Sequence, residues 1–365
     1  MTKRRTKTLT KQSETTLDDW DAEKVVENKL TDKERVMAEL ERERSRLKAK
    51  EHDSLVKALR SELMLAEKRL NAVIDITNTD IKPVIIKPTS KGLKDAIPVF
   101  CLSDLHIEER VDSDQVNGLN SYDPTIATAR LKQYFESVLW LLEGHRKMAN
   151  IDKIVLWIGG DTLTGFIHDE FKESNWLHPV EAILLLQDLL CSGIDLLLKH
   201  GGVNEIIIPC NFGNHGRTNP EKTIATAAKN SFEWLMYHNL AGYYKNNPKV
   251  RFNIANSYHL YMDIYDTVVR FGHGDHIKYG GGIGGLTIPI NKKIAAWNTS
   301  RHADIDVMGH FHQLTNHRHF IVNGSLIGIN AYALSIGATF EPPQQAFFMI
   351  RPERGMSAFA PIYVT

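Results

Sequence analysis

Pro98-Val99-Phe100-Cys101-Leu102-Ser103-Asp104-Leu105-His106 joins a short apolar run to two side chains that can bind metal ions. The apolar run indicates a buried strand that ends at Ser103-Asp104. Asp104 and His106 stand two positions apart, so their side chains leave a continuing strand on the same side. The stretch therefore predicts half of a metal site at the end of a strand.

Four further clusters follow apolar runs in the same way. They are Gly160-Asp161, Gly213-Asn214-His215, Gly272-His273-Gly274 and Gly309-His310-Phe311-His312. Each cluster alone is typical of a turn or a helix cap. Open α/β sheets, however, place their sites in the crevice beyond the carboxyl ends of the strands, so five such strands would direct these side chains to one place. The five clusters together favour a metal centre.

In this order the clusters resemble the calcineurin-like metallophosphoesterases, whose pattern is D-x-H, G-D, G-N-H, a later histidine beside glycine, and G-H-x-H. The resemblance covers residues 97–325 and is nearest to the DNA-repair nuclease and phosphodiesterase branch. It implies two divalent metal ions, the first held by Asp104, His106 and His312, the second by Asn214, His273 and His310, with Asp161 bridging both.

A dinuclear centre of this kind has a defined chemistry. Two cations about 3.5–4 Å apart can share a water, lower its pKa so that hydroxide forms near neutral pH, and hold the phosphoryl oxygens during in-line attack. The mixed carboxylate, amide and imidazole ligands suit manganese, iron, zinc or cobalt. Manganese is the expected metal.

The resemblance places His215 beside the cations, where it is the candidate general acid for the leaving oxygen. Family members usually carry an acidic residue after this histidine, but this chain has Gly216, so the group that orients His215 must come from elsewhere. Arg217 is a candidate substrate-binding residue that could offer its guanidinium group to a phosphate oxygen. Loop arginines are more often simply solvated.

The composition is that of a globular protein, with 42% hydrophobic residues in 365 and 44 basic against 44 acidic side chains. Residues 1–95 carry 22 basic and 18 acidic side chains, whereas residues 96–365 carry 22 and 26, so the front of the chain is the basic part. Three unpaired cysteines argue for a reducing compartment. The start has no apolar signal segment and no stretch is apolar enough to span a membrane, which predicts a cytoplasmic protein.

The chain divides into four parts by pattern. We expect a flexible polar tail over 1–30, a charged helical region over 31–75, a linker over 76–96 and a metallophosphoesterase domain over 97–365. Within the helical region a short coiled-coil seam repeats at spacings of three and four: Val56, Leu59, Leu63, Ala66, Leu70 and Val73. This seam is a candidate surface for homo-oligomerisation. A glycine-rich stretch over 279–285 is expected to border the site.

Helical patterns at 124–149, 178–200, 219–242 and 286–300 alternate with the first strands, and short strands dominate after Val250. Alternating units followed by strands predict two sheets packed face to face with helices outside. This agrees with the four-layer α/β/β/α sandwich that the resemblance implies, preceded here by the N-terminal helical region.

The predicted function is hydrolysis of phosphodiester bonds by attack of a metal-bridging hydroxide. DNA or RNA is the expected substrate because of the basic front and the resemblance to repair nucleases. A nucleotide or cyclic-nucleotide phosphodiesterase, or a phosphomonoesterase, is the first alternative. The second alternative is a non-catalytic scaffold that keeps the fold. Every expected ligand type is present, which favours an enzyme.

Overall fold

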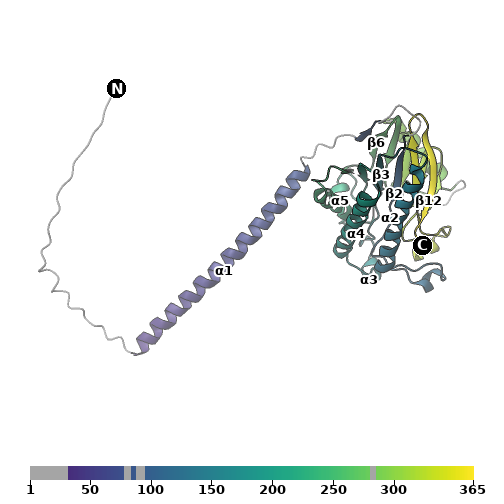
Figure 1. The fold of residues 1–365 in the computed structure, drawn as a ribbon. Helices are drawn as coiled ribbons and strands as arrows, with labels where there is room; N and C mark the ends of the chain where they lie inside the picture. Colours follow the sequence, from purple (N-terminus) through teal and green to yellow (C-terminus); the bar gives the residue numbers. More distant parts are fainter. Residues whose placement is uncertain (1–31, 78–83, 88–94, 280–284) are drawn as a thin grey trace, which may run out of the picture. The chain divides into compact units, whose positions relative to one another are not determined.

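The structure is a computed structural model that describes residues 32–77, 84–87, 95–279 and 285–365 (Figure 1). It contains two compact units, Met1–Thr79 and Asp80–Thr365. The predicted tail over 1–30 and most of the glycine-rich stretch over 279–285 lie outside the described residues.

The first unit contains one long helix, α1 (Asp32–Thr77), which runs for 46 residues without a break. Its side chains are described for residues 35–50, 52–64 and 67. Leu59 and Leu63 are 55% and 61% exposed. These leucines belong to the side of the helix on which the sequence predicts a coiled-coil seam.

The first sheet of the second unit has six strands in the order β12-β11-β2-β3-β4-β5. The strands are β2 (Ile97–Leu102), β3 (Lys153–Ile158), β4 (Glu205–Cys210), β5 (Val250–Ile254), β11 (Gln344–Arg351) and β12 (Gly355–Tyr363). Strands β2 to β5 are parallel, and β11 pairs antiparallel with both β2 and β12. All residues of β2 are buried, as expected for a strand that is covered on both faces.

Three helices cover the outer face of this sheet: α2 (Pro124–Arg146), α4 (Pro179–His200) and α5 (Phe232–Tyr243) (Figure 1). Proline stands in the first turn of α2 and of α4, where its missing N–H costs nothing. The Asp123 carboxylate caps α2 by accepting the Ile126 N–H at 2.7 Å. A short helix, α3 (Phe171–Ser174), lies in the segment between β3 and α4.

The second sheet also has six strands, in the order β1-β6-β7-β8-β10-β9. The strands are β1 (Val84–Ile86), β6 (Leu260–Ile264), β7 (Thr267–Phe271), β8 (Ile305–Met308), β9 (Thr315–Asn316) and β10 (Phe320–Val322). Helix α6 (Thr287–Asn298) buries Ile290 and Ile294 against its outer face. Another short helix, α7 (Ala331–Ser335), precedes β11.

The inner faces of the two sheets share one apolar core. It contains Val99, Trp157 and Phe348 from the first sheet, and Met262 and Phe271 from the second. Helices, two sheets and a helix thus form the predicted four-layer α/β/β/α sandwich. None of the helices in the described part of the chain is long and apolar enough to cross a membrane.

Two predicted boundaries are corrected. The region 76–96 is not only a connection, because Val84–Ile86 pair in parallel with Met262–Ile264 and extend the second sheet. The helix predicted over 219–242 begins only at Phe232, where Ser231 accepts the Trp234 N–H and caps α5. Residues 219–227 form bends, a turn and coil, and a short 3-10 helix follows at Ala228–Asn230.

Candidate metal centre

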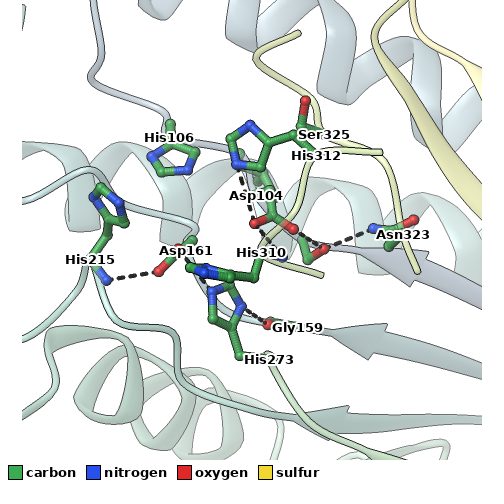
Figure 2. A network of polar contacts seen from close by, with 12 residues as sticks. Asp104, His106, Gly159, Asp161, His215, His273, His310, His312, Asn323 and Ser325 are labelled. Carbon is green, nitrogen blue, oxygen red and sulfur yellow. Dashed lines mark hydrogen bonds and ion pairs between the residues drawn. The ribbon is translucent and has the colours of Figure 1, made fainter. Parts of the chain in front are cut away.

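The five sequence clusters meet at the carboxyl ends of five strands. Three of these strands, β2, β3 and β4, belong to the first sheet, and two, β7 and β8, belong to the second. Figure 2 shows the aspartates and histidines from these loops facing a common centre, with His215 at its side. The two packed sheets therefore form the site jointly.

The first group that could hold a metal ion is Asp104, His106 and His312, whose donor atoms all lie within 4.8 Å of one another. The Nδ1 atom of His106 contacts the Thr164 hydroxyl at 3.0 Å, and this hydroxyl donates to Glu109 at 3.1 Å. A proton on Nδ1 leaves the Nε2 lone pair free for a metal ion. Asp104 is held by the Ser103 hydroxyl at 2.5 Å.

The second ligand group is Asp161, His273 and His310, with donor atoms again within 4.8 Å of one another. His273 donates from Nδ1 to the Gly159 carbonyl at 2.8 Å, and its Nε2 lies 2.8 Å from Asp161 (Figure 2). The backbone N–H of His310 donates to Asp104 at 2.9 Å, so the two ligand groups adjoin.

Asn214 lies between two residues that touch Asp161. The N–H of His215 donates to Asp161 at 2.8 Å, and a Cβ on Gly213 would stand 2.1 Å from the same carboxylate oxygen. The Oδ1 atom of Asn214 is buried without a hydrogen-bond partner, and so is Nε2 of His106. Buried polar atoms normally have partners, so an unpartnered oxygen and an unpartnered nitrogen beside two carboxylate–histidine groups mark positions where a metal ion can bind. The donor set and these two atoms fit a pair of divalent cations.

The backbone is strained at most of the predicted ligands. Positive φ angles occur at Asp104 (54°), His106 (49°), Asp161 (46°), His310 (71°) and His312 (54°). Non-glycine residues rarely adopt this left-handed conformation, which costs of order 1–3 kcal/mol each and persists where surrounding contacts impose it. Such strain gathers at functional sites, and here it aims the side chains of three loops at one centre.

Glycine is required where two of the loops meet. Gly160 has a φ of 85°, and a Cβ there would stand 2.4 Å from the backbone nitrogen of Gly213. Any side chain at this position would force apart the loops that carry Asp161 and Asn214. The glycine at this position in the sequence pattern is thus explained by close packing of backbone.

Two buried carboxylates fix the loops from behind. Glu233 of α5 accepts the Thr162 N–H at 2.6 Å, the Thr162 hydroxyl at 2.8 Å and the Gly213 N–H at 2.6 Å. Glu108 accepts the N–H groups of Thr164 and Gly165 at 2.9 and 2.7 Å. Burial raises the pKa of each of these carboxyl groups to about 7.

The surroundings shift the pKa values of the histidines at the centre in opposite directions. Burial lowers the pKa of His310 to about 4 and lowers the pKa of His106 well below its usual value, which favours the neutral form that binds metals. Burial also opposes the charged form of His273, but the adjacent Asp161 outweighs it and raises the pKa of His273 to about 10. A metal ion bound here would therefore have to displace a proton from the Asp161–His273 pair.

His215 is held by a group that the sequence does not point to. Its Nδ1–H donates to the Thr164 carbonyl at 3.0 Å, and its ring lies edge-on to His106 with centroids 4.8 Å apart. The carbonyl fixes the ring, since the next residue, Gly216, has no side chain that could do so. The Nε2 atom is left for the substrate.

Arg217, the candidate substrate-binding residue, makes several hydrogen bonds to its own loop. Its guanidinium group donates to the carbonyls of Asn214, Asn219 and Pro220 at 2.8–3.1 Å. Much of its donor capacity thus holds the loop that carries Asn214.

Sequence reasoning missed the residues that support the ligands. Glu108, Thr164 and Glu233 lie far from most of their partners along the chain, and no motif marks them. The one sequence signal is that Glu108 stands two positions after His106.

Comparison with known proteins gives no matching family model and no matching curated sequence. Similar solved structures include a predicted phosphoesterase from Streptococcus pneumoniae, 13% identical with a TM-score of 0.27, covering 70% of this chain and 83% of that chain. Vacuolar protein sorting 29 from Cryptosporidium parvum is 12% identical, with a TM-score of 0.29 and coverage of 74% and 99%. Sulfate thiohydrolase SoxB from Thermus thermophilus is 10% identical, with a TM-score of 0.29 and coverage of 76% and 57%. At these low values the likeness decides neither activity nor substrate, and the site rests on its own geometry.

Proposed function

We propose that this chain is a metal-dependent phosphoesterase that hydrolyses phosphodiester bonds, with DNA or RNA as the substrate. One observation carries the proposal. Two adjoining carboxylate–histidine groups, with the buried Asn214 oxygen and His106 nitrogen unpartnered, stand beside a histidine whose Nε2 is free.

The ligand assignment is the one that the sequence pattern implies. Asp104, His106 and His312 would hold one cation, and Asn214, His273 and His310 the other, with Asp161 shared between them. Two divalent cations, when bound, supply a nucleophilic water near neutral pH and neutralise charge on the phosphoryl oxygens. Manganese is the proposed metal, and iron, zinc and cobalt also suit these ligands.

The chain's own residues position the acid and the loops. The Thr164 carbonyl fixes Nδ1–H of His215, so that Nε2–H of the imidazolium can be delivered to the leaving oxygen. Glu108 holds the Thr164 turn, and Glu233 ties the Asp161 loop to the Asn214 loop. A preorganised site of this kind avoids the cost of rearranging its dipoles during the reaction.

The choice of a nucleic acid rests on the surroundings of His215. A cleft with aromatic and aliphatic walls also contains Arg217 and the ion pair of Lys172 with Asp169 at 2.7 Å, and the Arg217 guanidinium group suits a polyanion carrying planar bases. The excess of basic residues over 1–95 supports the same substrate. A phosphomonoester or a small cyclic nucleotide would use less of this surface.

The test combines metal analysis with hydrolysis of bis(p-nitrophenyl) phosphate in manganese. Wild-type protein should hold two metal ions per chain and turn over. Asp161→Asn should lose both metal and turnover, because this carboxylate contacts both the His273 ring and the Asn214 loop. Full metal loading with no turnover at any pH or metal supply would favour the non-catalytic scaffold.

A cleavage panel then ranks the substrates. Single-stranded DNA, duplex ends, RNA, cyclic nucleotides and phosphopeptides are compared at equal metal supply by kcat/KM. The proposal requires a DNA or RNA substrate to lead. A cyclic nucleotide or a phosphomonoester in first place would replace the nuclease assignment while leaving the metal centre intact.

A further inference from the structure

A cleft with a volume of about 580 Å³ lies in the region of His215. Its walls come from the segment 166–172 after β3, the start of α4, the loop 217–220 after β4, and Phe232 at the start of α5. Sites for small molecules typically measure about 300–1,000 Å³ and are mostly apolar with a few polar groups. The cleft has the size for one nucleoside.

A row of rings connects the cleft with His215. The Phe171 ring lies 5.9 Å from the His215 ring and 5.7 Å from the ring of His168, which lines the cleft. Arg217, another lining residue, donates to the Asn214 carbonyl at 2.8 Å. The cleft therefore adjoins the side of the site where a leaving oxygen would receive its proton.

The walls suit a planar base. Phe166 is fixed edge-on to His178 with ring centroids 5.7 Å apart, and Val180 is 61% exposed. Bases stack on such side chains with a gain of about 1–3 kcal/mol per base. Each Nη nitrogen of Arg217 has two N–H groups, of which one donates to a loop carbonyl and the other can meet a phosphate.

We infer that this cleft binds the leaving nucleoside of the phosphodiester, with its base against Phe166. The inference rests on the proposed function. It specifies in addition that the protein recognises the nucleoside on the leaving side of the scissile bond. Recognition here favours a substrate with a base on the leaving side over one with sugar and phosphate alone.

The test uses thymidine dinucleotides from which one base has been removed. Cleavage products identify the leaving nucleoside, and kcat/KM is compared with and without the base on that side. Wild-type protein should prefer the intact dinucleotide by about tenfold, as one stacked base provides. Phe166→Ala should reduce the preference to near one without changing kcat/KM for the abasic substrate.

Trp140→Ala is the matched control, since this tryptophan is 74% exposed on α2 and does not line the cleft. It should keep the preference. Equal rates on both dinucleotides in wild-type protein would overturn the inference, and so would an equal loss on both in Phe166→Ala. Cleavage of bis(p-nitrophenyl) phosphate without any dinucleotide cleavage overturns the inference alone, whereas no cleavage of either removes the proposed function as well.

Helix α1 supports a second inference on independent grounds. Its seam positions repeat as Val56, Leu59, Leu63 and three later residues, and Leu59 and Leu63 are more than half exposed. In this register Arg60 and Glu67 occupy e positions, and Glu62 occupies a g position. Charges at these positions flank the seam and set the direction of pairing.

The charges favour one direction. A parallel pair of α1 helices would bring Glu62 of one copy opposite Glu67 of the other, which is repulsive. An antiparallel pair centred between positions 63 and 66 brings Arg60 opposite Glu67, and symmetry provides this attraction twice. We propose that α1 associates with a second copy of this chain in the antiparallel direction.

Charge reversal separates the two directions because its effects are opposite in sign. Glu67→Arg should weaken an antiparallel dimer of the full chain about tenfold, since Arg60 would then face arginine. The double variant Arg60→Glu with Glu67→Arg should restore the wild-type dissociation constant. Sedimentation equilibrium measures both. A monomer at all concentrations, or tighter association of Glu67→Arg, would overturn the proposal.

Discussion

The Nδ1–H group of His215 donates to the Thr164 carbonyl at 3.0 Å, and the N–H of the same threonine donates to Glu108 at 2.9 Å. A buried carboxylate thus orients the candidate acid through one backbone turn. Burial raises the pKa of Glu108 to about 7, and the two N–H groups that donate to this carboxylate oppose the rise. The arrangement replaces a direct contact between an acidic side chain and the imidazole.

His215→Ala should lower kcat by about 10²–10⁴-fold for substrates with poor leaving groups, as loss of a general acid does. Metal content should not change, and an activated aryl ester should suffer much less because its leaving oxygen needs no proton. Steady-state kinetics on both substrates and elemental analysis provide the measurement. Equal losses on both substrates would contradict the acid role.

Glu108→Ala should show the same pattern in weaker form. Both N–H groups donate to one carboxylate oxygen, Oε1, and alanine removes this acceptor. We expect the ratio of aryl-ester to alkyl-ester turnover to rise, with the metal content unchanged. Asp112→Ala, which removes a carboxylate that is 41% exposed in the same loop, is the control and should leave the ratio unaltered.

Asn214→Ala should reduce the metal content from two ions to about one, because the unpartnered Oδ1 atom is the candidate ligand from the β4 loop. Asn214→Asp keeps an oxygen at this position and should retain both ions. Elemental analysis after dialysis against a metal-free buffer distinguishes the variants. Full metal content in Asn214→Ala would remove this residue from the ligand set.

Glu233→Ala should destabilise the second unit by about 3 kcal/mol or more, since three buried donors lose their acceptor at about 1–3 kcal/mol each. Glu233→Gln keeps an acceptor oxygen and should lose less. Denaturant unfolding monitored by tryptophan fluorescence measures both. A wild-type midpoint for Glu233→Ala would show that the loops hold without this carboxylate.

Metal binding should release protons. Because Asp161 raises the pKa of His273 to about 10, the metal-free pair holds a proton at pH 8 that a cation must displace. Apparent affinity should therefore rise with pH between 7 and 9. Titration calorimetry in two buffers of different ionisation enthalpy counts the protons, and identical heats in the two buffers would contradict the expectation.

The conformation of each strand and the polar cluster at its end follow from local sequence. A continuous apolar run such as 154–158 is stable as a strand only where both faces of the strand are covered, and the glycines and the carboxylate directly after it mark where the strand stops. These features depend on neighbours in the chain, so β2, β3, β4, β7 and β8 and their five clusters could be located before any coordinates. The same reasoning placed α5 too early because a helical pattern does not say where a cap forms.

Tertiary structure decided how the site is held. Glu233 reaches residues 71 and 20 positions away, and Thr164 reaches His215 across 51 positions. No sequence pattern marks such contacts, because they depend on which helix packs against the ends of which strands. The sequence alone determined which side chains stand at the ends of the strands that meet at the candidate metal centre. The packing of the two sheets and α5 determined the orientation, the hydrogen-bond partners and the pKa values of these side chains.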